Sequence, residues 1–189
     1  MKTAAIATSI LASALAVSAQ NIQSKPFNLE IVSDDDTVNG KYVGACHSGA
    51  AIESLCLTDR PVTMHLNSTS EQDLDNGLLT WLLPSNLPVD SSMRLIADPS
   101  SNVAQALFYP GPSGGQYVQF KDDKLTLLSN IDDTQVPIKA GNPESLENWF
   151  FCQSYYTSYR YNTLSWVYGK AEPQNPTCVK VSVKRNYEY

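Results

Sequence analysis

Short apolar runs with a period of two recur along this chain from Phe27 onward. In FNLEIV (27–32), Phe27, Leu29 and Ile31 share one face of an extended strand. Gly, Pro, Asn and Asp interrupt such runs every eight to twelve residues or so, a spacing typical of an antiparallel all-β domain. The other predicted strands are GKYVGAC (40–46), VTMHL (62–66), GLLTWLL (77–83), SMRLIA (92–97), QALFYP (105–110), QYVQF (116–120), KLTLL (124–128), the aromatic stretch from Trp149, LSWVYG (164–169) and CVKVSVKR (178–185).

Helix is scarce in this pattern. NPESLEN (142–148) has a capping Asn followed by Pro and predicts one helical turn, whereas SGAAIESLC (48–56) fits a helix or an irregular segment equally well. No interval accommodates a series of crossover helices, which argues against an α/β fold. We therefore predict one all-β domain, an antiparallel β-sandwich of the jelly-roll kind. A β-trefoil is the alternative, ranked second because no threefold repeat is visible.

The first nineteen residues predict a secretory signal peptide. Lys2 precedes an uncharged Ala-rich run that ends in Val17-Ser18-Ala19, a pattern that signal peptidase accepts. Cleavage before Gln20 leaves a flexible N-terminus (20–26) and a domain over 27–189. The polar C-terminal end lacks the apolar tail of a glycolipid anchor, so we expect an extracellular protein without a membrane anchor.

The acidic balance argues against nucleic acid as a partner. The chain has 13 Lys and Arg against 19 Asp and Glu, a net charge of -6, and loss of Lys2 takes it to about -7. Phosphate binding needs clustered basic residues, and here they are scattered. About 170 mature residues suffice for one core, and we expect a monomer.

Four cysteines in an exported chain predict two disulfides. Three pairings are possible, and pairing Cys46 with Cys56 and Cys152 with Cys178 closes the shortest loops. Each bond would stabilise the fold by about 3 kcal/mol through the unfolded chain. The spacing of the cysteines does not fit a metal site, and we expect no metal and no cofactor.

Asn67 begins the sequon Asn67-Ser68-Thr69. It lies in the polar run LNSTSEQDLDNG, which predicts a glycan on a surface loop.

Nine of the eighteen aromatic residues fall between Trp149 and Tyr168. WFFCQSYY (149–156) is apolar on both faces, which is typical of a central, buried strand. From Tyr155 onward, Tyr155, Tyr159 and Tyr161 occupy positions of the same parity, which predicts a row of rings on one face and a polar row on the other. Tyrosines can pack over a sheet edge with their hydroxyls outward; with Trp166, they can also form a flat face that binds sugars or proteins.

No catalytic constellation emerges from the sequence. Neither His47 nor His65 stands in a nucleophile motif. A carboxyl pair for glycoside hydrolysis could be drawn from Glu144, Glu147 and Asp98, but any acidic protein supplies such pairs. The Asp runs at 34–36, 122–123 and 132–133 are better read as solvated turns than as calcium loops. We expect no enzymatic activity.

Several stretches together resemble a family of small secreted ascomycete proteins with a domain of unknown function. They are KPFNLEIVS, GACHSGAAIESLCL, SNVAQALFYPG, VQFKDDKLTLLS and the block from Trp149 through PQNPTCVKV to Arg185. The resemblance implies a fungal source, a secreted β-rich fold and four structural cysteines. The layout is also similar to that of fungal cell-wall and conidial-surface proteins.

These observations predict a non-catalytic structural protein of a fungal cell wall or spore surface, which could also act at a host interface. A carbohydrate-binding module that uses Tyr155, Tyr159, Tyr161 and Trp166 is the alternative, and a small glycan hydrolase is the third. The expected partner is cell-wall polysaccharide or a host surface.

Overall fold

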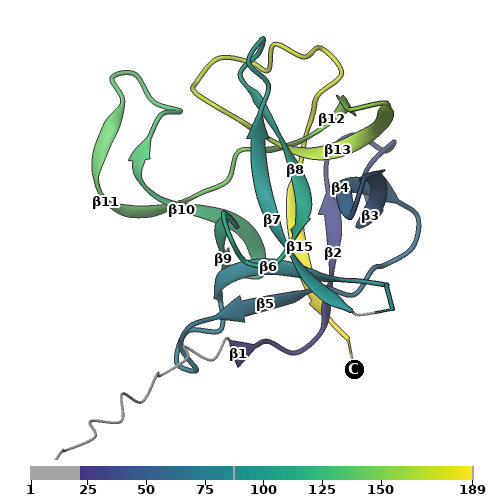
Figure 1. Cartoon of the computed structure of the whole chain (residues 1–189). Coiled ribbons are helices and arrows are strands. Elements are labelled where there is room, and N and C mark those ends of the chain that lie inside the picture. The colour runs from purple at the N-terminus through teal and green to yellow at the C-terminus, as the bar shows by residue number, and fades with distance from the viewer. Residues whose placement is uncertain (1–21, 87, 189) are drawn as a thin grey trace, which may run out of the picture.

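A computed structural model describes residues 22–86 and 88–188, and this part of the chain consists of strands and connecting turns with no helix (Figure 1). The predicted signal peptide lies outside the described residues. The strands are β1 (Ile22–Gln23), β2 (Phe27–Val32), β3 (Tyr42–Gly49), β4 (Ile52–Thr58), β5 (His65–Ser68), β6 (Asn76–Leu83), β7 (Val89–Ala97), β8 (Val103–Pro110), β9 (Tyr117–Lys121), β10 (Lys124–Asp132), β11 (Lys139–Leu146), β12 (Trp149–Tyr156), β13 (Tyr159–Val167), β14 (Val179–Lys180) and β15 (Ser182–Tyr187).

The strands pair antiparallel and close on themselves, so the predicted all-β class is confirmed. Following the hydrogen-bonded neighbours leads from β6 through β9, β10, β15, β2, β3, β4, β8 and β7 back to β6. The fold is thus a closed barrel, and its pairings do not form a clear jelly-roll sandwich or trefoil. Strand count and spacing could not reveal this closure, because it depends on pairings between strands far apart in the sequence, such as β15 with β2.

Strand β13 joins the barrel at one place. Ser54 of β4 pairs with Leu107 of β8, but two residues further along β4 the partner of Cys56 is Thr163 of β13. The same edge of β13 pairs with the start of β8, where Ser165 lies opposite Gln105, and the other edge of β13 pairs with β12. The β12–β13 hairpin therefore joins the wall where β4 and β8 separate, with β13 paired to both, and the end of the hairpin lies outside the ring.

The barrel interior is filled by the inward residues of each strand. Phe27, Leu29 and Ile31 of β2 are fully buried, as the period-two pattern predicts, and Val183 and Arg185 of β15 lie opposite two of them. Alternation of this kind places one row of each strand inside and the other outside. Large rings and aliphatic side chains from almost every strand form one continuous core.

Three local predictions differ from the structure. NPESLEN is not a helical turn: most of it belongs to β11, which pairs with β10 and forms a hairpin that projects from the barrel (Figure 1). SGAAIESLC is neither helical nor irregular: it contains the end of β3, a two-residue turn with Ala51 at φ 58°, and most of β4. Within the segment expected to be flexible, β1 pairs with β5, and Ser24 N donates to Leu66 O at 2.9 Å.

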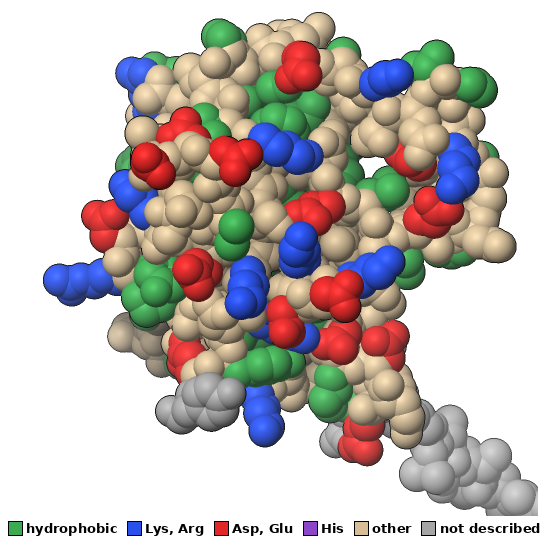
Figure 2. Space-filling model, turned by 180° about the vertical axis from the view of Figure 1, so that it is seen from behind, with side chains coloured by type: hydrophobic (Ala, Val, Ile, Leu, Met, Phe, Trp, Pro, Cys, Tyr) green, Lys and Arg blue, Asp and Glu red, His purple; other side chains and the backbone are tan. Residues whose placement is uncertain are grey.

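The surface carries charges of both signs. In the view of Figure 2, basic and acidic side chains alternate over the face and neither sign forms a separate field. Among the described residues no helix is long and apolar enough to cross a membrane.

Candidate functional site

The end of the β12–β13 hairpin exposes tyrosines on both of its faces. The chain reverses at Thr157, whose φ is 54°, so Tyr156 pairs with Tyr159 and Tyr155 pairs with Arg160. Cross-strand partners share a face of a hairpin, and successive residues alternate. Tyr155 therefore lies on the face opposite Tyr159. The prediction that Tyr155, Tyr159 and Tyr161 form one row is wrong, because it counted parity through a turn.

Tyr159 and Tyr161 stack on one of these faces. Their ring planes are 9° apart and their centroids 6.4 Å apart. The Tyr161 hydroxyl donates to the carbonyl oxygen of His47 at 3.0 Å, and the His47 ring meets Tyr159 edge-on at 5.2 Å. His47 Nδ1 lies 3.2 Å from Glu53 Oε1, which is buried in the β3–β4 hairpin. The ring pair is thus held against β3, while 36 % of Tyr159 stays exposed.

Trp166 is a core residue and does not belong to a ligand face. It is 4 % exposed and packs edge-on against Trp149, with ring centroids 4.9 Å apart. The indole Nε1 of Trp149 donates to Leu125 O at 2.9 Å, so both rings are fixed inside the barrel. Strand β13 runs from the exposed hairpin end into the barrel wall. Trp166 lies in the part of the strand that belongs to the wall.

Tyr155 is the most exposed ring of the hairpin. Its side chain is 64 % exposed, and the Arg160 guanidinium carbon lies 5.5 Å from its centroid. Tyr155 stands at the rim of a cleft of about 550 Å³ between the β7–β8 hairpin and the end of β12. A cleft of this size lies within the ~300–1,000 Å³ range of small-ligand sites.

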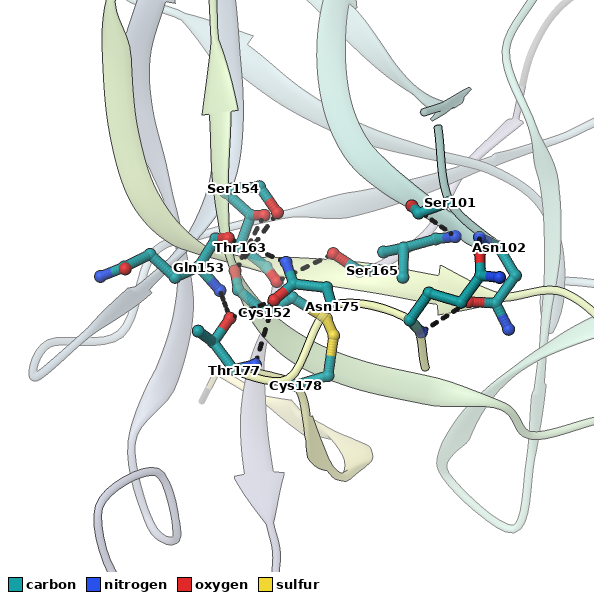
Figure 3. Close-up of a disulfide and its surroundings, with 12 residues drawn as sticks. Ser101, Asn102, Cys152, Gln153, Ser154, Thr163, Ser165, Asn175, Thr177 and Cys178 are labelled. Carbon is teal, nitrogen blue, oxygen red and sulfur yellow. Dashed lines mark hydrogen bonds between the residues drawn. A yellow bond between two sulfur atoms is a disulfide. The ribbon is translucent and has the colours of Figure 1, made fainter. Parts of the chain in front are cut away.

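Three side chains converge on the edge of β12 that borders this cleft. Gln153 N donates to Thr177 Oγ1 at 2.9 Å, and Asn175 Nδ2 donates to Gln153 O at 3.0 Å. Gln105 Nε2 donates to Tyr155 O at 3.1 Å. Figure 3 shows Asn175, Thr177 and Gln153 gathered beside the Cys152–Cys178 disulfide. Side chains thus occupy this stretch of the strand edge, in place of another strand.

The segment between β13 and β14 is anchored at both of its ends. Cys178 is joined to Cys152 of β12, and within the segment Asn102 and Gln174 exchange two hydrogen bonds of 2.9 Å. Asn102 Nδ2 also donates to Tyr168 O at 3.2 Å. These bonds hold the polar wall of the cleft in place.

The second disulfide joins Cys46 of β3 to Cys56 of β4, so both predicted pairs are present in the structure. Beside it, the hydroxyls of Ser48 and Ser54 are hydrogen-bonded to each other at 2.6 Å and are buried. The Thr157 hydroxyl donates to Ser48 O at 3.0 Å, which ties the β12–β13 turn to the β3–β4 hairpin.

The carboxyls considered for glycoside hydrolysis are each engaged locally. Glu144 pairs with Lys139, and Glu147 accepts a hydrogen bond from Ser182. Hydrogen bonds from the side chain and backbone of Ser100 hold the pKa of Asp98 below its usual value. A general acid needs the opposite shift, since it must stay protonated at working pH.

The acidic runs form hydrogen-bonded turns. Asp35 and Asp132 each accept hydrogen bonds from the threonine two residues ahead, which lower the pKa of both carboxyls. This is the local geometry expected of Asp in a solvated turn. Within residues 22–86 and 88–188, no group of three or more His, Cys, Asp or Glu is arranged to hold a metal ion.

Asn67 is not on a surface loop, contrary to the prediction from its polar surroundings. It lies in β5 between β1 and β6, it is 8 % exposed, and Gln23 Nε2 donates to its Oδ1 at 3.3 Å. The polar run predicted the wrong location because its first residues belong to β5. This strand ends at Ser68, directly before the turn. Glycosylation of Asn67 stays a prediction.

Sequence reasoning missed the amides that build the cleft. Gln105 belongs to a predicted strand, and Asn175 belongs to a polar stretch before Cys178. Neither their residue types nor their spacing in the sequence indicates a binding site. The one available signal was the concentration of Gln and Asn in PQNPTC, next to a disulfide cysteine.

The fold and its two cross-links define a disulfide-stabilised, antiparallel all-β domain with a polar cleft beside exposed tyrosines. The chain belongs to the family described as a domain of unknown function, DUF7907, which matches residues 24–187. No match was found among curated proteins or among solved structures.

Proposed function

We propose that this chain is an exported, non-catalytic protein of a fungal cell wall or spore surface, held there by noncovalent binding to polysaccharide. The end of the β12–β13 hairpin makes the contact. The proposal combines the structural role predicted from the sequence with the carbohydrate-binding alternative, because a protein held noncovalently in a wall must bind a component of that wall.

Two disulfides support a location outside the cell. Such bonds persist in oxidising compartments and are rare where thiols are kept reduced. The resemblance to small secreted ascomycete proteins and the predicted signal peptide agree with this location.

The observation that carries the binding function is the parallel ring pair of Tyr159 and Tyr161, with Tyr155 exposed at the same hairpin end. Sugar rings have apolar faces of C–H groups that stack on aromatic rings, and the tyrosine hydroxyls can bond to the sugar edge. The pair is held by His47 before any ligand arrives, which lowers the entropy cost of binding.

The lowered pKa of Asp98 and the local partners of Glu144 and Glu147 support a non-catalytic role over a glycan hydrolase. A retaining or inverting glycosidase needs two carboxyls that face each other across a substrate, one with a raised pKa.

The test is retention of the purified mature protein on insoluble chitin, β-1,3-glucan and cellulose. We expect retention on at least one of them, and loss of most of it in a Tyr159→Ala, Tyr161→Ala double variant. Tyr117→Ala is the matched control, because Tyr117 is 51 % exposed but lies on β9, away from the hairpin.

Absence of retention on every polysaccharide would overturn the proposal. Equal retention of the wild type and the double variant would show that the Tyr159 and Tyr161 rings do not contribute to polysaccharide binding. Turnover of any of these glycans would contradict the non-catalytic assignment.

A further inference from the structure

The cleft beside Tyr155 combines apolar and polar walls. Ile96, Ala97 and Pro99 come from the end of β7 and the turn after it. The opposite wall carries Gln153, Ser154 and Asn175. A hexopyranose has the same division, with apolar ring faces and a rim of hydroxyls that both donate and accept hydrogen bonds.

The amides of this cleft are held in fixed orientations by backbone groups. Asn175 Nδ2 is bound to Gln153 O, and Asn175 Oδ1 accepts from the backbone and hydroxyl of Thr177. Gln105 Nε2 is bound to Tyr155 O. Preorganised polar groups recognise a ligand at low cost, because little rotamer freedom remains to be lost.

The side chain of Gln105 also carries a hydrogen-bond acceptor. Its Oε1 is buried and has no hydrogen-bond partner within the described part of the chain. An unsatisfied buried acceptor is unfavourable, because it has lost its hydrogen bonds to water. A small shift of the Gln105 side chain would let a ligand hydroxyl in the cleft supply the missing donor.

The charge of the cleft selects against anionic sugars. Asp98 is the one charged side chain among the residues that line it. Hydrogen bonds from Ser100 lower the pKa of Asp98 and keep its carboxylate ionised. Arg160, which contacts two of the residues that line the cleft, is engaged with Gln153 and with the ring of Tyr155. A uronate or a phosphate would meet a carboxylate without a free basic partner.

We propose that this cleft is a subsite for a neutral hexopyranose unit of the polysaccharide, with Tyr155 stacking on the sugar ring and Gln105 and Asn175 bonding its hydroxyls. This inference rests on the proposed polysaccharide binding, and it assigns a ligand class and a second contact area to the opposite face of the hairpin from Tyr159 and Tyr161.

The experiment is a titration of the ¹⁵N-labelled mature protein with three soluble probes: N-acetylchitohexaose, laminarihexaose and an oligogalacturonate of the same length. We expect at least one neutral probe to shift the side-chain amide resonances of Gln105 and Asn175. The oligogalacturonate should leave both in place.

A variant whose side chain fills the cleft tests whether the sugar binds there. Ala97 is exposed at the rim, so Ala97→Trp should weaken binding of the neutral probe at least tenfold without disturbing the core. The matched control is Ala171→Trp, which places the same side chain in a different cleft, beside Gly169 and Lys170. Tyr155→Ala, at a position 64 % exposed, is a second variant that should fold normally and bind at least fivefold more weakly.

The outcomes separate the two proposals. If the wild type is retained by a polysaccharide but Ala97→Trp and Tyr155→Ala bind as it does, the subsite is overturned and the binding function stands. Stronger binding of the oligogalacturonate overturns the ligand class. If the wild type binds none of the polysaccharides or oligosaccharides, both proposals fail.

Discussion

Arg185 and Phe120 face each other inside the barrel, with the guanidinium carbon 4.3 Å from the centre of the ring. The Arg185 side chain is 5 % exposed, and its Nη2 donates to Asp75 Oδ1 at 2.7 Å and to Asp123 Oδ1 at 3.0 Å. The rings of Phe27 and Tyr187 lie close to the same group. A buried charge is tolerated when it is paired and hydrogen-bonded, and here rings and carboxylates share that task.

Replacement of this arginine should be costly. We expect Arg185→Met to lower the free energy of unfolding by about 2 kcal/mol, because it removes both ion pairs and the cation–π contacts while the half-exposed carboxylates regain water. Lys184→Met, the neighbouring exposed position, should change stability by less than about 0.5 kcal/mol. Urea unfolding of both variants measures the difference. Equal effects would show that Arg185 contributes no more than a surface charge.

The two disulfides should contribute unequally. Cys152 and Cys178 are 26 positions apart and Cys46 and Cys56 are 10 apart, and longer loops lose more entropy when they are closed in the unfolded chain. Paired Cys→Ser replacement of the first bond should cost about 0.8 kcal/mol more than replacement of the second. Thermal unfolding of the two double variants tests this order. A larger loss from the shorter loop would contradict the chain-entropy explanation.

Gly77 is required by a close approach of two strands. A Cβ at this position of β6 would fall well inside van der Waals contact with the carbonyl oxygen of Asn67 on β5, which is backbone and cannot rotate away. Gly77→Ala should therefore destabilise the fold by about 1–3 kcal/mol. Gly141→Ala, on β11, meets no atom within 4 Å and should be neutral or slightly stabilising. Chemical denaturation of the pair distinguishes them, and equal stability would refute the clash.

Stability should fall in alkaline solution because of Tyr109. Burial, the hydrogen bond with Tyr156 and the charge of Tyr156 raise the pKa of Tyr109 to about 12. Since the unfolded tyrosine ionises near pH 10, its stabilising contribution is complete below that pH and is lost as the pH rises towards 12. Tyr109→Phe should lose less stability between pH 10 and 12 than the wild type, and Tyr117→Phe serves as the control. Ultraviolet titration and unfolding at each pH provide the measurement. Identical pH profiles for Tyr109→Phe and the wild type would contradict the shift.

The aromatic hairpin shows where one-dimensional patterns stop being informative. Trp149 to Cys152 are buried on both faces of β12, as their composition predicts. Tyr155 and Tyr159 have the same parity in the sequence but lie on opposite faces, because the turn at Thr157 restarts the alternation. Trp166 has the composition of a ligand ring, and only the entry of β13 into the barrel wall makes it a core residue.

The sequence by itself determined the properties that depend on neighbours in the chain: period-two strands, turn residues and the short loops that make cysteine pairing local. Closure of the barrel, burial of Asn67 and assembly of the cleft from Gln105, Tyr155 and Asn175 were decided only by the tertiary structure. These features arise from pairings between distant strands and from side chains that meet across them. Local alternation states which residues face inward, but it contains no information on which strand lies alongside.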